Sequence, residues 1–285
     1  MKQFKTVALL GLLSALLISI SYYTIGGTAG VVMGIMIAAA TNLGSWYYSD
    51  KIALAAYKAQ PVTPEQAPEL HGMVQKLAAK AEIPMPAVYI IPTAAANAFA
   101  TGRDPEHAAV AVTQGIMKML PQDELEGVLA HELTHIINRD TLTQAVAATI
   151  GGAIAFLAQI LQYSMWFGGG RDDDGPNPIA LLATIIIAPM AATVIQLGIS
   201  RTREFAADAG AAKLTGNPQA LAKALKRLEM SAEKLPMDAN PAFSPLLIIN
   251  TLPKQALKSL FSTHPSTEQR VERLLSMEPA QLTTV

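Results

Sequence analysis

The sequence predicts a mainly α-helical membrane protein, in which four transmembrane helices carry an α+β domain with a small β-sheet. Composition and charge patterning support this fold class. Hydrophobic residues make up 51% of the 285 residues, and charged residues make up only 15%. The charged residues are also unevenly spread, because residues 6–49, 141–170 and 175–200 contain none. A spanning helix needs about 20 apolar residues, so the first stretch has room for two spans and each of the others for one.

The four predicted spans divide the chain into alternating membrane and water-exposed parts. They are expected at residues 7–25, 29–48, 142–167 and 178–199. The predicted organisation is therefore a pair of spans in residues 1–49, a first part of the α+β domain in 50–140, a second pair of spans in 141–200, and a second part of the domain in 201–285.

The distribution of basic residues predicts the orientation of the spans. Lys2 and Lys5 precede the first pair of spans, and Lys51 follows it. Arg201 and Arg203 follow the last span, whereas the loop between spans three and four carries one arginine against three aspartates. Because cytoplasmic loops carry an excess of lysine and arginine, we expect both termini and the α+β domain in the cytoplasm.

The water-exposed parts combine helical and strand-like patterns. Apolar spacing predicts an amphipathic helix at 70–81, and short apolar runs bounded by turn residues predict strands at 88–91, 97–102 and 108–113. Further helices are predicted up to residue 119 and at 121–137, 203–214, 218–230 and 267–277. Five prolines between residues 235 and 265 predict an irregular segment there.

Charge and cysteine content exclude several classes of site. The formal net charge is −1, and the sequence has no basic patch with interleaved aromatic residues, so nucleic acid is not an expected partner. The chain has no cysteine. A metal ion would therefore have to be held by histidine, aspartate or glutamate side chains.

The strongest chemical signal is His131-Glu132-Leu133-Thr134-His135, near the end of the helix predicted at 121–137. We expect this helix to lead straight into the span predicted at 142–167, which would place the motif near the membrane surface. Histidines four residues apart share one face of a helix and can bind one metal ion, while the neighbouring glutamate can reach a water on that ion. Zinc hydrolases use this arrangement: the metal lowers the pKa of the water and the glutamate acts as general base. The alternative is a solvated helix face without metal.

A third protein ligand is expected, because a catalytic zinc usually has three protein ligands and one open position. The position six residues after His135 is Thr141, so the motif does not continue to a third histidine. Glu204 is best placed because it follows span four at the same membrane face, although it could instead pair with a neighbouring arginine. Asp208 would share its helical face and could accept the second ring N–H of a metal-bound histidine, or be a surface charge.

Several stretches together give the sequence a family resemblance. They are Asn97-Ala98-Phe99-Ala100-Thr101-Gly102, residues 131–140, residues 200–211 and Thr263-His264-Pro265. With the order of spans, they resemble the HtpX group of membrane zinc metalloproteases, which are relatives of the CAAX prenyl endopeptidases. The resemblance implies a zincin-like fold for the α+β domain and one zinc ion per chain.

The same resemblance implies roles for individual residues. It assigns the zinc ligands to His131, His135 and Glu204, and the general base to Glu132. Asn138 and Asp140 match the family's extension of the motif and would act as supporting residues.

His264 has two interpretations. A histidine before a proline near a helix start is often a capping or packing residue. The resemblance instead gives it a role in the catalytic site, either steadying the tetrahedral oxyanion or occupying the metal in a resting state. Arg270 is a second candidate for contact with the same anion.

The resemblance also implies a cellular role. It predicts endoproteolysis of damaged or misassembled membrane proteins, and of unfolded polypeptides, on the cytoplasmic side of a bacterial inner membrane. Participation in the stress response, and cooperation with other membrane quality-control proteases, would follow from the same role.

The strand predicted at Asn97, Ala98, Phe99 and Ala100 also has two interpretations. It could be a core strand that ends in a turn. Alternatively, it is an edge strand to which an extended substrate adds by backbone hydrogen bonds, which would make sequence selectivity weak.

Two other functions compete with a membrane-surface protease. In an intramembrane protease the metal motif would lie deep within a span, but Arg139 and Asp140 directly after the motif make that depth costly. A membrane scaffold or chaperone could instead keep a structural zinc site. Structural sites usually fill all four positions with protein ligands, and here three ligands and a general base can be named.

Overall fold

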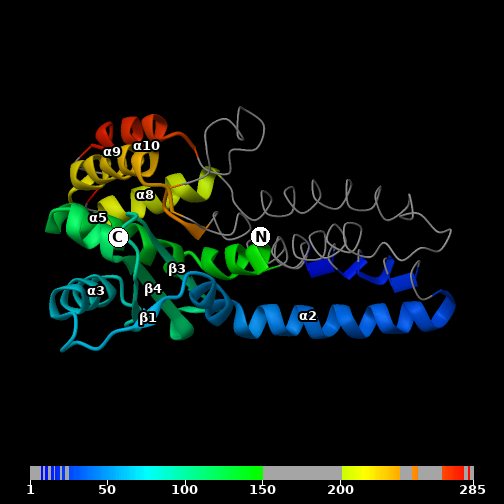
Figure 1. Cartoon of the computed structure of the whole chain (residues 1–285). Helices are drawn as coiled ribbons and strands as arrows, with labels where there is room; N and C mark the ends of the chain where they lie inside the picture. Colours follow the sequence, from blue (N-terminus) through cyan, green and yellow to red (C-terminus); the bar gives the residue numbers. More distant parts are fainter. Residues whose placement is uncertain are drawn as a thin grey trace.

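The computed structural model describes residues 26–149, 201–237, 246–249, 265–278 and 282, together with individual positions between 8 and 22. The longest described helix is α2 (Gly27–Ala56), which extends away from the sheet and from the other labelled helices (Figure 1). Its part Gly27–Tyr48 is, among the described residues, the one segment long and apolar enough to cross a membrane by length and composition. This helix includes the second predicted span, and many of its large apolar side chains are exposed, with Leu43 at 67%.

The described positions between residues 8 and 22 are helical and lie against α2. The amide of Asn42 donates a hydrogen bond to the hydroxyl of Ser14 over 2.8 Å. A Cβ atom on Gly34 would lie 2.6 Å from the Cα of Ile18, so the two backbones approach too closely for a larger residue. Small residues and a polar bridge at a helix contact are typical of paired transmembrane helices.

Only part of the predicted second pair of spans can be compared with the structure. Residues 140–149 are helical, as expected for the start of span three. The rest of span three and all of span four lie outside the described residues, as does His264. The four-span architecture therefore stays a prediction.

The rest of the described structure includes a four-stranded mixed sheet. Its strands are β1 (Gln60–Pro61), β2 (Ala87–Ile91), β3 (Ala98–Gly102) and β4 (Ala108–Thr113), in the order β1-β2-β4-β3. Strands β2 and β4 are parallel, whereas β1 and β3 each run antiparallel to their neighbour. The three strands predicted from the sequence are confirmed, and β3 is at the edge of the sheet.

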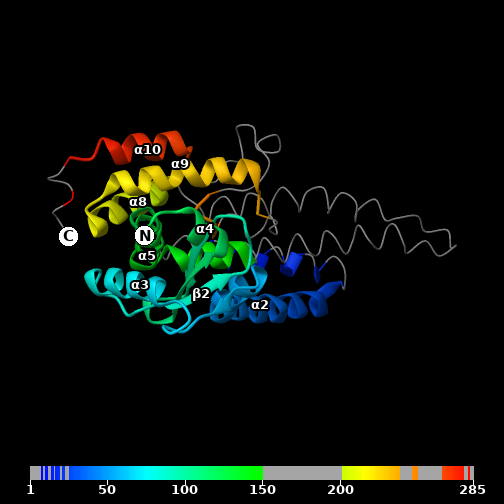
Figure 2. The same ribbon diagram turned by 60° about the vertical axis from the view of Figure 1, so that its left-hand side comes forward.

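The remaining described helices lie beside the sheet or against one another. They are α3 (Pro68–Lys80), η1 (Pro105–His107), α4 (Gln114–Met119), α5 (Gln122–Ile137), α8 (Arg201–Thr215), α9 (Pro218–Lys234) and α10 (Thr267–Leu275). Helix α5 lies in the middle, with α3 and the sheet on one side and α8, α9 and α10 on the other (Figures 1 and 2). Two chain segments separated by residues 150–200 thus share one hydrophobic core.

Two glycines allow the helices to approach α5 closely. A Cβ atom on Gly127 of α5 would lie 3.1 Å from the backbone nitrogen of Leu221 in α9. A Cβ atom on Gly210 of α8 would lie 2.4 Å from the side chain of Thr134, which stands between the two histidines of the motif. The absence of a side chain at Gly210 therefore brings α8 against the face of α5 that carries the motif.

The connection from α5 to the following helix differs from the sequence expectation. We expected the helix of His131 to lead straight into span three. Instead α5 ends at Ile137, Asn138 forms its C-cap, and Arg139 adopts a left-handed conformation with φ of 57° before the helix resumes at Asp140. This conformation is uncommon for a residue with a side chain and breaks the helix, so the metal motif and the next helix are separate elements.

Candidate active site

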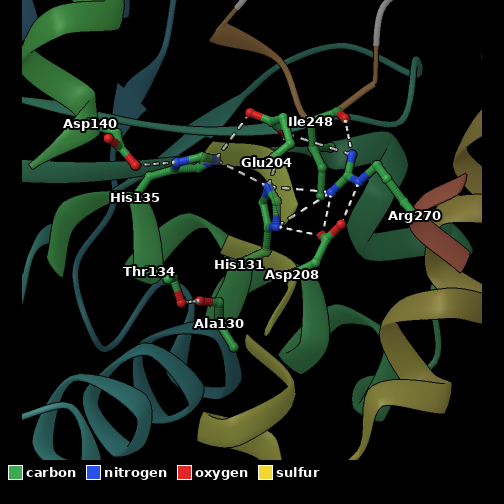
Figure 3. Close-up of polar contacts among 9 residues, drawn as sticks. All are labelled: Ala130, His131, Thr134, His135, Asp140, Glu204, Asp208, Ile248 and Arg270. Atoms are coloured by element: carbon green, nitrogen blue, oxygen red, sulfur yellow. Dashed lines mark hydrogen bonds and ion pairs between the residues drawn. The ribbon is translucent and has the colours of Figure 1, made fainter. Parts of the chain in front are cut away.

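The two histidines of the motif converge at the buried face of α5 (Figure 3). Their Nε2 atoms lie 3.2 Å apart, and both side chains are shielded from solvent. Glu204, on the first turn of α8, places its two carboxylate oxygens 3.6 Å from the two Nε2 atoms. Ligand atoms of all three residues lie within 4.8 Å of one another.

This donor set fits a zinc ion. Two ligand atoms about 2.0–2.1 Å from a tetrahedral zinc lie about 3.3 Å apart, close to the spacing of the imidazole nitrogens. Two imidazoles and one carboxylate are also the donors of a common class of catalytic zinc site. Three protein ligands leave the fourth position for a water molecule or a substrate oxygen.

Asp208 lies one helical turn after Glu204 and contacts the other nitrogen of His131. Its Oδ1 atom is 2.9 Å from the His131 Nδ1 atom. A carboxylate in this position accepts the N–H of Nδ1 and leaves Nε2 with a lone pair for a metal. Burial opposes a charge on His131, but the neighbouring carboxylates of Asp208 and Glu204 outweigh burial and raise its pKa to about 9. Asp208 therefore fixes both the tautomer and the direction of the ring.

Arg270, from α10, completes this network (Figure 3). Its Nε and Nη2 atoms donate two hydrogen bonds to the Asp208 carboxylate, at 2.9 and 2.7 Å, and the guanidinium is 1% exposed. Burial alone would raise the pKa of Asp208, yet the charge of Arg270 lowers it below its usual value. Arg270 also lies 3.8 Å from Glu204, so one buried cation faces both carboxylates of α8.

The second histidine has a weaker partner. Asp140, the first residue of the helix after the turn, places Oδ2 3.5 Å from His135 Nδ1, at the limit of hydrogen bonding. Arg203 of α8 lies 3.9 Å from the other oxygen of Asp140. Asn138, the remaining supporting residue suggested by the sequence, is at the C-cap of α5. The break between α5 and the next helix thus positions Asp140 beside the motif.

Glu132 lies between the histidines and the edge of the sheet. It is 2% exposed, and burial is the main reason that its pKa is raised. The neighbouring backbone of Ala100 in β3 and the two histidines act in the opposite direction and favour its ionised form. A buried carboxylate with a raised pKa beside a metal site has the properties of a general base that later returns the proton.

Strand β3 presents its outer edge to the catalytic face. Because N–H and C=O groups of alternate residues point to the same side of a strand, the groups of Ala98 and Ala100 face outward while those of Phe99 face β4. The side chain of Phe99 packs against Tyr57, with ring centroids 5.2 Å apart. Asn97 is fully buried, and its amide donates to the carbonyl of Ile249 over 3.1 Å.

Residues 246–249 lie along this edge. The backbone N–H of Ile248 donates to the carbonyl of Ala98 over 3.1 Å, and the carbonyl of Ile248 accepts from Nη1 of Arg270 over 3.1 Å. Leu246, Leu247 and Ile248 line a cavity of about 10 Å³ together with Glu204 and the residues of the motif. That volume is close to the space of a single water molecule.

Comparisons with known proteins identify the family. Residues 64–278 match the model of peptidase family M48. This chain belongs to peptidase family M48. It is 66% identical to a "Protease HtpX homolog" of Trichormus variabilis, covering 99% of both chains, and 50% identical to one of Pyrococcus furiosus, covering 95% of this chain and 94% of the relative.

A solved structure shares the fold. Ste24p of S. mikatae superposes with a TM-score of 0.52 at 21% identity, over 95% of this chain and 65% of that chain. This chain thus spans about two thirds of the length of Ste24p. The fold is that of an M48 peptidase, and the grouping of His131, His135 and Glu204 is consistent with a metallopeptidase.

The structure also contains features that sequence analysis did not find. The sequence suggested Arg270 only as a contact for an anion, whereas its guanidinium lies against Asp208 and the Ile248 carbonyl. The close approach of α8 to α5 at Gly210 could not be predicted, because the need for a glycine within a helix depends on which helix packs against it. The contact between residues 246–249 and β3 could not be predicted either, since the two segments are about 150 residues apart in the chain.

Proposed function

We propose that this M48 peptidase is a membrane-bound zinc endopeptidase that cleaves misfolded or damaged membrane proteins on the cytoplasmic side of a bacterial inner membrane. The observation that carries the proposal is the convergence of His131, His135 and Glu204 beside the buried Glu132, directly against an edge strand. The edge strand can hold an extended polypeptide at the base and metal site through backbone hydrogen bonds.

The chemistry follows from the arrangement of these side chains. Zinc, when bound, lowers the pKa of a water molecule and polarises the scissile carbonyl. Glu132 accepts the proton of the attacking water and donates it to the leaving amine, and its raised pKa suits both steps. Asp208 holds His131 in the tautomer that can bind the metal, and Arg270 keeps Asp208 ionised.

The membrane location is supported by aromatic residues near the C-terminal end of α2. The guanidinium of Arg103, which follows β3, lies 4.9 Å from the ring centroid of Tyr47 and 5.8 Å from that of Trp46. Tyrosine and tryptophan concentrate at membrane–water interfaces. With the four-span topology, this contact would place the end of β3 next to the membrane surface, where segments of membrane proteins become accessible.

A protein with a non-catalytic zinc site would use the same ligands but would not need Glu132. The decisive experiment compares detergent-purified wild type with Glu132→Gln, measuring zinc per chain and cleavage of an unfolded membrane protein. We expect equal zinc content and a loss in kcat of about 10²- to 10⁴-fold in the variant, because the general base is removed.

The matched control is Glu126→Gln on the outer face of the same helix. Glu126 pairs with Lys76 at the surface over 2.9 Å, so this variant should cleave like the wild type. Zinc in both Glu132→Gln and wild type, with cleavage by neither, would favour the scaffold with a structural metal and contradict a peptidase.

A further inference from the structure

The outer edge of β3 is already paired in this structure. The carbonyl of Ala98 accepts a hydrogen bond from the backbone N–H of Ile248 over 3.1 Å. The N–H of Ala98 donates to the side chain of Asn97 over 3.0 Å. An extended substrate that adds to β3 needs the Ala98 and Ala100 groups for its own backbone, so it must compete with Ile248 for the carbonyl of Ala98.

The segment 246–249 resembles a bound peptide in its contacts. Besides the backbone bond to β3, its carbonyls are held by two buried side chains, Asn97 at Ile249 and Arg270 at Ile248. Leu246 and Leu247 pack into the apolar cluster that contains Phe99 and Tyr57, and Leu247 is fully buried. The segment also lines the small cavity beside His131, Glu132 and His135. A separate polypeptide would have to occupy this same space to reach the metal ligands.

The sequence of the segment, Leu-Leu-Ile-Ile, indicates which side chains this place accepts. All four side chains are buried and aliphatic. Extended aliphatic runs are exposed when a transmembrane helix loses its partners and unfolds, because about 20 such residues make up each span. The groove therefore suits the same chemistry in a substrate.

We propose, building on the peptidase function above, that residues 246–249 occupy the substrate's place on β3 and inhibit the enzyme. A substrate is bound by exchange with this segment, and extended aliphatic segments are the class that exchanges with it. The same contacts therefore determine both inhibition and substrate specificity, since the internal segment and the substrate use the same backbone groups and the same apolar contacts.

The first test measures exposure of the segment and does not depend on turnover. Because the chain has no cysteine, Leu247→Cys introduces a single thiol at a buried position of the segment. The zinc-loaded, full-length protein also carries Glu132→Gln, which prevents cleavage. The probe is the capped hexapeptide acetyl-Ala-Leu-Leu-Ile-Ile-Ala-amide, with binding measured by fluorescence anisotropy and thiol exposure by the rate of maleimide labelling.

We expect saturating hexapeptide to raise the labelling rate at position 247 by about tenfold or more, as the segment leaves β3. The matched control, Leu225→Cys, places the thiol at an equally buried position of α9 that the peptide does not approach, so its rate should not change. Bound peptide without faster labelling at position 247 would overturn the inference. Failure of the aliphatic peptide to bind would overturn it as well.

The second test measures peptidase activity. Ile248→Pro removes the N–H that donates to the carbonyl of Ala98. A lost hydrogen bond should shift the exchange toward the substrate, so kcat/KM for an aliphatic substrate should rise about three- to tenfold in the proline variant and stay at the wild-type value in Glu126→Gln, whose side chain lies outside the site. Leu247→Ala, which weakens the apolar contact without touching the backbone, should change kcat/KM in the same direction.

The outcomes separate this inference from the proposed function. If wild type cleaves and both loosened variants cleave more slowly, residues 246–249 are a fixed wall of the site and the inference fails, while the peptidase function stands. If zinc-loaded wild type cleaves nothing, the proposed function fails, and the labelling experiment still decides whether the peptide displaces the segment.

Discussion

The metal side of the active site and its substrate side are held together by different kinds of interaction. On the metal side, charged side chains from three helices meet: His131 from α5, Asp208 from α8 and Arg270 from α10. On the substrate side, the edge of β3 offers backbone groups, and aliphatic side chains of residues 246–249 cover it.

This difference separates chemistry from recognition. Buried ion pairs depend strongly on geometry, so the metal side tolerates one arrangement of its side chains. Backbone groups are the same for every residue, so a strand edge can accept many sequences and discriminates mainly through apolar contacts. The proposed function, cleavage of damaged proteins, would need this combination, because the reaction is constant and the substrates vary.

The largest expected effect is on the metal side, from Arg270→Met. The substitution leaves the Asp208 carboxylate buried without its cationic partner, and breaking a buried pair in this way costs about 3–5 kcal/mol. The midpoint of thermal unfolding should fall by at least about 6 °C, because each kcal/mol corresponds to about 2–4 °C in a protein of this size. Circular dichroism of the detergent-solubilised protein measures the change.

Lys76→Met provides the comparison for this prediction. It removes an ion pair of similar length whose lysine is exposed, and such pairs contribute less than about 1 kcal/mol. Adding Asp208→Asn to Arg270→Met should recover part of the lost stability, since the buried charge of Asp208 is then removed together with its partner. Equal melting temperatures for Arg270→Met and Lys76→Met would show that the buried network does not stabilise the metal side.

A smaller effect is expected on metal affinity. Asp208→Asn should weaken zinc binding about 10- to 100-fold, the usual cost of losing the carboxylate behind a metal-bound histidine. Asp140→Asn should cost less than about tenfold, because its contact with His135 is 3.5 Å long whereas that of Asp208 with His131 is 2.9 Å. Competition with a chelator measures both affinities, and a larger loss for Asp140→Asn would reverse the order of importance that the distances give.

The same division explains how far the sequence could predict the molecule. Helices α3, α5, α8, α9 and α10 and strands β2, β3 and β4 were predicted to within a few residues, because local periodicity and caps define them. Glu204 was found as the third member of the metal group from its position after a span, and Asp208 from helical spacing. Their roles as ligand and supporting residue stay predictions.

Three other features of the structure depend on contacts between distant residues or on local backbone conformation, which a sequence pattern does not predict. The left-handed conformation of Arg139 has no residue signal, since glycine or asparagine is the usual choice there. The pairing of Arg270 with Asp208 joins residues 62 positions apart. Residues 246–249 lie in a proline-rich stretch that predicted irregular structure, and their contact with β3 comes from the tertiary fold alone.

The smallest expected effect tests the substrate side directly. If a substrate adds to β3 as a strand, its backbone N–H groups face β3 only at every second residue. N-methylation of a peptide substrate at one residue at a time should therefore raise KM about two- to tenfold at alternate positions, the cost of one hydrogen bond, and leave KM nearly unchanged between them. Positions next to the scissile bond are omitted, so kcat should stay constant.

A uniform response along the peptide would contradict strand addition and leave apolar contact as the source of binding. An alternating response in the wild type that becomes larger in Ile248→Pro would support exchange of the segment for substrate, because the hydrogen bonds of the substrate would then no longer be offset by those of the displaced segment.

Arg270 links the two sides of the active site, because it contacts both Asp208 and the carbonyl of Ile248. Exchange of the internal segment for substrate would release one buried hydrogen bond of the residue that holds the metal side together.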